Sequence, residues 1–138
     1  MEEHSWNDCL EQNKARSVSS DPAKARSLLE TAAARSAFVA THTIDATNAN
    51  WLFEMEYASL LEALHALCIG RGFTVANHSC LGFYLRDVLR RDELFRTFDR
   101  CRYRRNGIVY YGIRMEFATA KESIDDARRI SKVLHHAI

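Results

Sequence analysis

The chain has 138 residues, of which 47% are hydrophobic and 27% are charged, a balance that suits one globular domain and excludes a mainly disordered chain. It contains 5 Gly and 1 Pro, too few turn residues for an all-β domain, whose turns recur every ~8–12 residues. The formal net charge is +1, and such a balance points neither to a nucleic acid nor to a membrane surface as a partner. The composition therefore favours a single helical domain.

The sequence predicts a cytoplasmic protein without membrane contact. No apolar run approaches the roughly 18 residues of a membrane span, and the acidic start Glu2-Glu3 differs from the basic and then apolar start of a secretory signal. In the cytoplasm, thiols stay reduced, so we expect four reduced and mostly buried cysteines: Cys9, Cys68, Cys80 and Cys101. Because no two of them form a Cys-x-x-Cys pair, we expect no zinc site, and nothing else indicates a metal or a cofactor.

The first 20 residues are polar, and we expect them to form an extension of a helical domain that spans residues 21–138. Within the extension, Trp6, Cys9 and Leu10 recur at a one-turn spacing. A short helix can therefore dock on the domain through these three side chains.

Apolar residues at spacings of three and four predict five further helices in residues 21–138. Their expected starts are Asp21-Pro22, Asp45 or Thr47, His78 or Ser79, Asp92, and the capping box Thr119-x-x-Glu122. The second of these helices has the most apolar pattern and is expected at the centre, ending at Gly70 and Gly72. The fold class predicted is all-α, an up-and-down bundle of about five helices with a short N-terminal helical extension.

One segment departs from the helical pattern. Residues 111–117 alternate between apolar and other side chains, as a strand does. No convincing partner strand exists elsewhere in the sequence, and an isolated strand is unstable. We therefore expect residues 112–118 to form an extended connection that lies on the core.

Charge is distributed unevenly along the chain. Residues 1–65 contain five basic and ten acidic side chains, a net charge of −5, whereas residues 66–138 contain 14 basic and 8 acidic ones, a net charge of +6. The basic excess consists of arginines, which bind phosphates in a bidentate manner and stack on bases: Arg86, Arg90, Arg91, Arg96, Arg100, Arg102, Arg104 and Arg105. Two interpretations remain open. The arginines form a nucleotide or nucleic-acid footprint, or they form a solvated helix face balanced by Asp87, Asp92, Glu93 and Asp99.

Arg105 stands apart from the other arginines because it shares a face with apolar residues that are expected to point inward, namely Leu94, Phe98 and Cys101. A buried charge without a partner is very costly. Arg105 therefore needs either a buried ion pair with Glu54, Glu56 or Glu62, or a wet cleft that holds an anion. In the second case, the adjacent Asn106 adds a donor and an acceptor.

In this region the chain resembles the HEPN family of small all-helical proteins, over roughly residues 21–136. The resemblance is carried by the run from Glu56 to Ala66, by the connection from Gly72 to His78, and by Arg105-Asn106 followed by Tyr110-Tyr111-Gly112. It implies a helical bundle that forms a homodimer, with the Arg-containing helices of both subunits lining a shared cleft. Many members of the family are metal-independent endoribonucleases, often the toxin that is paired with a small nucleotidyltransferase, and other members are thought to bind nucleotides.

The chain departs from the ribonuclease members of that family, in which a His follows the Arg and the polar residue. Here Arg105 and Asn106 match the first two positions, but Tyr110 stands where a His is expected. Tyrosine is a poor base at pH 7 because its pKa is near 10. The leading interpretation is thus a homodimer that binds a nucleotide or RNA without efficient cleavage, through Arg102, Arg105, Asn106, Tyr110 and Tyr111.

Two alternatives stay open. An active ribonuclease toxin would use Arg105 with Tyr110 or His78, although His78 at the start of a helix is more typical of a capping residue. A structural subunit without catalysis would use the arginines to bind an acidic protein surface, such as that of a nucleotidyltransferase.

Overall fold

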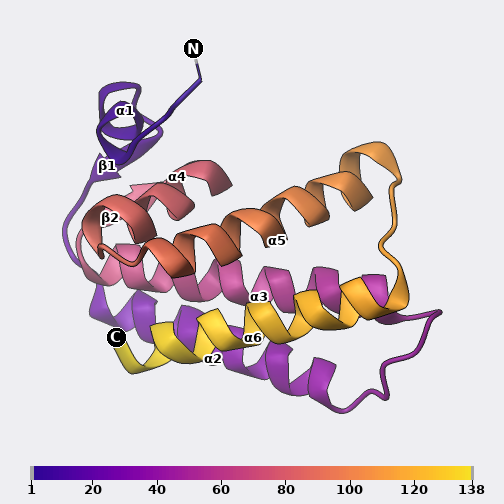
Figure 1. Cartoon of the computed structure of the whole chain (residues 1–138). Helices are drawn as coiled ribbons and strands as arrows, with labels where there is room; N and C mark the ends of the chain where they lie inside the picture. Colours follow the sequence, from indigo (N-terminus) through magenta and orange to yellow (C-terminus); the bar gives the residue numbers. More distant parts are fainter. Residues whose placement is uncertain (1, 138) are drawn as a thin grey trace.

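A long helix, α3 (Ala49–Gly70), forms the centre of the chain (Figure 1). In this computed structural model, which describes residues 2–137, α2 (Pro22–Ala40) and α6 (Phe117–Ala137) pack along α3. The fourth long helix, α5 (Asp92–Tyr111), contacts both α3 and α6. The predicted all-α class is confirmed. Met1 and Ile138, the last residue of the predicted domain, lie outside the described residues.

The shorter elements gather at one end of α3 (Figure 1). They are α1 (Trp6–Glu11), β1 (Ala15–Ser17), β2 (Phe73–Val75), α4 (His78–Phe83) and a π-helical turn, η1 (Tyr84–Val88). The two strands form a small antiparallel sheet in which Ala15 faces Val75, a pairing that was not predicted. Within residues 2–137, no helix combines the length and the apolar content that a membrane crossing requires.

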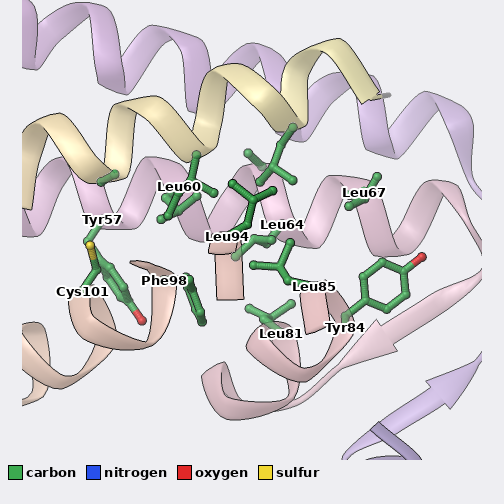
Figure 2. Close-up of a cluster of buried hydrophobic side chains, with 14 of the residues drawn as sticks. Tyr57, Leu60, Leu64, Leu67, Leu81, Tyr84, Leu85, Leu94, Phe98 and Cys101 are labelled. Atoms are coloured by element: carbon green, nitrogen blue, oxygen red, sulfur yellow. The ribbon is translucent and has the colours of Figure 1, made fainter. Parts of the chain in front are cut away.

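One part of the core lies between α3 and the pair formed by α4 and α5, and α2 and α6 add further buried side chains to the core, among them Ala32, Val39, Ile124 and Ile130. Figure 2 shows Tyr57, Leu60, Leu64 and Leu67 of α3 in the same cluster as side chains from α4, η1 and α5. Those partners include Leu81, Leu85, Leu94, Phe98 and Cys101, and Leu81, Leu85, Phe98 and Cys101 are fully buried. This packing fixes the face of α5 that points outward, and so it positions the arginines.

The predicted helix starts lie close to the observed ones, whereas several predicted caps are wrong. Neither Asp45 nor Thr47 is at the cap position of α3, which is Asn48, and the cap position of α5 is Arg91 rather than Asp92. The Asp21 side chain accepts from the Lys24 amide and Pro22 is the first residue of α2, as expected. At α6, however, the capping box is wrong, because the helix begins at Phe117 and Thr119 lies inside it. The Thr119 carbonyl accepts from the Ser123 hydroxyl instead of being part of a cap.

The non-helical connection before α6 covers residues 112–116, so the prediction for 112–118 is wrong for the last two residues, which belong to α6. Met115 packs on the core as expected, whereas Ile113 is exposed. A side chain of α3 holds the connection in place. The Asn50 side-chain oxygen accepts from the Met115 amide at 2.8 Å, and the Asn50 amide donates to the Met115 carbonyl at 3.0 Å. Gly112 ends α5 with a φ of 64°, a left-handed conformation that glycine adopts readily. The strand-like pattern therefore belongs to a connection in which Asn50 hydrogen-bonds the amide and the carbonyl of Met115, as a neighbouring strand would.

The expectation of four reduced thiols is wrong in the structure, because Cys9 of α1 forms a disulfide with Cys80 of α4. Cys68 and Cys101 are free and buried. The expectation relied on the compartment alone, whereas folding of the N-terminal segment places Cys9 beside Cys80. Trp6 packs on Phe73 and Tyr84 in the same region, so the segment is docked by apolar contacts as well as by the disulfide.

Candidate functional site

An open cavity of about 300 Å³ lies between the start of α4 and the middle of α5. We call it the α4–α5 cleft. The β2–α4 connection contributes Ala76 and Asn77 to its lining, and the start of α4 contributes His78 and Ser79. Helix α5 contributes Arg102, Arg105, Asn106 and Tyr110. Four of the five predicted binding residues therefore line one cleft, together with His78 from another helix.

Arg105 carries a charge that has no carboxylate partner among the described residues. Within residues 2–137 it forms no ion pair, and its hydrogen-bond partner is the Asn106 side-chain oxygen at 3.4 Å. Its guanidinium lies 5.9 Å from the ring centre of Tyr57 and 5.7 Å from that of Tyr110. Two aromatic rings thus hold the guanidinium beside the cleft while its donors stay available.

The alternative of a buried ion pair for Arg105 is wrong. Glu56 instead pairs with Arg128 at 3.1 Å, and Glu62 pairs with Arg35. No ion pair of Glu54 is formed within the described residues. Arg105 instead lines the open α4–α5 cleft.

Most of the other arginines in the basic excess are balanced within the chain. Six of the eight form ion pairs: Arg86 with Asp87, Arg91 with Glu93, Arg96 with Asp92, Arg100 with Asp126, Arg102 with Asp99, and Arg104 with Glu122. The interpretation as a helix face balanced by Asp87, Asp92, Glu93 and Asp99 is thus correct for four of them, whereas Arg100 and Arg104 pair with carboxylates of α6. Arg102 belongs to both groups, because it pairs with Asp99 at 2.9 Å and also lines the α4–α5 cleft.

His78 does not cap α4. The residue at the cap position is Asn77, whose side-chain oxygen accepts from the Cys80 amide at 2.9 Å. His78 Nδ1 lies 3.2 Å from the Tyr57 hydroxyl, and the ring lines the α4–α5 cleft. The sequence interpretation of His78 as a cap is therefore wrong by one residue, and this difference frees the imidazole for the cleft.

Burial, followed by the charges of Arg105, His65 and Arg102, lowers the pKa of His78 to about 4. The imidazole is consequently neutral at pH 7. Burial also raises the pKa of Tyr57, so its hydroxyl keeps its proton. These shifts keep both the imidazole and the phenol uncharged at pH 7.

The hydrogen bond between Tyr57 and His78 assigns the tautomer of the imidazole. Within the described residues, His78 Nδ1 is the only partner of the Tyr57 hydroxyl, and a buried hydroxyl needs an acceptor for its proton. If Nδ1 accepts, the proton of a neutral imidazole lies on Nε2. The cleft then collects donors from His78, Arg105 and Arg102, an arrangement that suits an anion.

Tyr111 is the one predicted binding residue that the structure places elsewhere. It lines a neighbouring cavity of about 350 Å³ together with Tyr103, Arg104, Gly107, Ile113 and Met115, and Asn106 and Tyr110 reach both cavities. Tyr103, Tyr110 and Tyr111 are 77%, 67% and 76% exposed. The end of α5 thus presents an aromatic surface beside the cleft, to which Tyr111 belongs.

Ala76, Asn77 and Ser79 line the cleft although the sequence analysis did not identify them as site residues. Ala76, Asn77 and Ser79 reach the cleft because β2 and α4 place the start of α4 against α5. The available signal was Asn77, since Asn is a strong capping residue and would have shifted the cap away from His78.

Comparison of the chain with models of known protein families, with curated protein sequences and with solved structures found no match.

Proposed function

We propose that this chain is a HEPN-like, non-cleaving protein that binds the phosphates of a nucleotide or of RNA in the α4–α5 cleft. The observation that carries the proposal is Arg105, a partly buried arginine with no carboxylate partner among residues 2–137. Arg102 and the Nε2–H assigned to His78 add donors beside it. Tyr110 supplies an exposed ring on which a base can stack.

Replacing Arg105 with alanine is expected to weaken binding of a short single-stranded RNA by about tenfold to a hundredfold, the loss of one or two hydrogen bonds to a charged group. Fluorescence anisotropy at one fixed salt concentration measures the affinity, because phosphate contacts are strongly salt-dependent. Arg96→Ala is the matched control, since Arg96 lies on the same helix, pairs with Asp92 and does not line the cleft. Equal losses in both variants would indicate attraction by general charge, and no loss in Arg105→Ala would contradict the proposed site.

The pKa of His78 provides a second test. In the free protein we expect the ring protons of His78 to titrate near pH 4 in an NMR experiment. A bound phosphate neutralises the field of Arg105 and Arg102, so a saturating nucleotide is expected to raise this pKa towards the ordinary value near 6.5. Arg105→Ala should raise it in the free protein and remove most of the response to nucleotide.

The same shift has a consequence for stability. The unfolded chain binds a proton at His78 more tightly than the folded chain does. The contribution of His78 to the free energy of unfolding is therefore fully present above pH 6.5, and it is lost as the pH falls towards 4. A His78 pKa near 6.5 in the free protein, unmoved by nucleotide, would contradict the electrostatic description of the cleft.

A metal-independent endoribonuclease is the second candidate, and one observation favours it. The His that the sequence lacks after Arg105 is present in the same cleft, supplied by α4 as His78. Against cleavage, a proton on Nε2 and a pKa near 4 both make this imidazole a weak base. RNA fragments with 2′,3′-cyclic phosphate ends, formed in EDTA and lost in His78→Gln, would establish the enzyme, whereas intact RNA supports binding alone.

The proposal includes a homodimer and a cytoplasmic nucleotidyltransferase partner, as in a toxin–antitoxin pair. Support for a second copy comes from the exposed side chains near the end of α5, Tyr103, Tyr111 and Ile113, which form an apolar surface beside the cleft. Sedimentation of the wild type and of Tyr111→Glu tests this association. The alternative of a purely structural subunit that binds acidic protein receives less support, because six of the eight arginines are already paired within the chain.

A further inference from the structure

A third opening lies on the other side of α6 from α5. Helices α2 and α6 both pack on α3 (Figure 1) and border an open groove of about 460 Å³, here called the α2–α6 groove. One wall is apolar and small, with Ala33, Ala37 and Ala40 of α2. The other wall and the floor are polar, with Ser36, Ser59, Arg128, Ser131, Lys132, His135 and His136.

A buried ion pair lies beneath this groove. The Glu56 side chain is 0% exposed, and one of its oxygens, Oε1, accepts from the Ser36 hydroxyl at 2.8 Å and from Arg128 Nε at 3.1 Å. The charge of Glu56 is therefore balanced by Arg128. The cationic side chain that remains on the groove wall is Lys132, one turn after Arg128 on α6.

Three buried polar atoms at this place lack hydrogen-bond partners within the described residues: Glu56 Oε2, Arg128 Nη2 and Ser131 Oγ. Ser131 is only 7% exposed and lines the groove. Buried polar atoms are almost always hydrogen-bonded in folded proteins. Three unsatisfied atoms in one cluster therefore mark a polar site just beneath the groove, which a polar molecule can complete once Arg128 or Ser131 turns towards it.

The chemistry of the walls selects the kind of molecule. Lys132 forms no ion pair within residues 2–137, whereas the charge of Arg128 is balanced by Glu56. No carboxylate is among the described residues that line the groove. A negatively charged head is consequently favoured beside Lys132, with the Arg128 side chain, which is 27% exposed, on the same wall. Arg128 Nη2 and Ser131 Oγ are buried, and they become donors to that head when their side chains turn towards the groove. The alanine wall can accept a small apolar body.

We propose that the α2–α6 groove binds a small organic oxyanion, a carboxylate or a phosphate monoester. Its head contacts Arg128, Ser131 and Lys132, and its apolar body lies against Ala33, Ala37 and Ala40. This site shares no lining residue with the α4–α5 cleft and does not depend on the function proposed there.

The test is an NMR titration of the full chain with phenyl phosphate and, separately, with octanoate, which distinguishes the two kinds of head. Saturable shifts are expected for amides of residues 33–40 and 128–136. Inorganic phosphate lacks the body and phenol lacks the charge, so each should bind more weakly than phenyl phosphate. The same shifts should persist in Arg105→Ala, which separates this site from the α4–α5 cleft.

Matched variants locate the ligand. Ala37→Phe fills the groove and is expected to weaken binding at least tenfold, whereas Ala34→Phe, at an exposed residue of α2 outside the groove, should leave the affinity unchanged. Lys132→Gln should weaken binding about fivefold, as for one partly exposed ion pair. Lys121→Gln, at an exposed position on the same helix, is its control.

Three results would overturn the proposal. One is the absence of saturable shifts at the groove with either probe. Another is an unchanged affinity in Ala37→Phe. The third is a crystal structure in which ordered waters satisfy Glu56, Arg128 and Ser131 while both probes fail to bind.

Discussion

Removing the disulfide through Cys9→Ala and Cys80→Ala is expected to lower the free energy of unfolding by about 4 kcal/mol. The bond joins residues 71 positions apart, and closing a loop of this length removes much of the entropy of the unfolded chain. Urea unfolding measures the change, because the shift of the midpoint at a constant slope reports stability.

Reductant provides the internal control. It should destabilise the wild type and leave the double variant unchanged. Cys68→Ala, which removes a buried free thiol, should cost only about 1 kcal/mol through lost packing. Identical unfolding of the wild type with and without reductant, once reduction is verified by mass spectrometry, would contradict the expected contribution.

Replacing Arg128 with methionine is expected to cost about 3–5 kcal/mol, because it leaves the carboxylate of Glu56 buried without an opposite charge. The Ser36 hydroxyl would be the one remaining hydrogen-bond donor to that side chain among the described residues. Thermal or urea unfolding at pH 7 measures the loss.

A second substitution makes this prediction specific. Adding Glu56→Leu to Arg128→Met removes the unpaired charge, and the double variant should recover most of the lost stability. Arg129→Ala is the control on the same helix: its side chain is 60% exposed and pairs with Asp126, so its loss should cost less than about 1 kcal/mol. A double variant less stable than Arg128→Met would show that the cost comes from packing rather than from charge.

The long helices could be predicted from the sequence because their signals are local. Asp21 and Pro22 begin α2 through a cap and a fixed φ, both properties of adjacent residues. The apolar pattern that places α3 at the centre also needs only the residues of that helix. The connection before α6 was predicted as extended, although its anchor, Asn50, could not be identified from the spacing of apolar residues.

The small sheet and the disulfide could not be predicted in this way. Ala15 pairs with Val75, and Cys9 bonds to Cys80, so both contacts join parts of the chain that no local period relates. They form because Trp6 docks on Phe73 and Tyr84 and brings the N-terminal segment to α4.

The candidate site shows the same division. Arg102, Arg105, Asn106 and Tyr110 line one cleft because their helical spacing places them on one face of a single helix, a relation that the sequence contains. His78 comes from another helix, so its place beside Arg105 required the tertiary structure. Tyr111 follows Tyr110 directly, and the rotation of about 100° per residue turns it to the neighbouring cavity.

The disulfide also divides the chain into two parts with different freedom to open. The covalent ring that it closes contains α2, α3 and both strands, whereas α5 and α6 follow after Cys80 and lie outside it. Amide protons of α5 and α6 can therefore exchange with solvent through a partial opening that leaves the ring intact. Arg105 lies on α5, outside the ring. One side of the α4–α5 cleft is therefore held by the disulfide at Cys80, whereas the other side can open without breaking it.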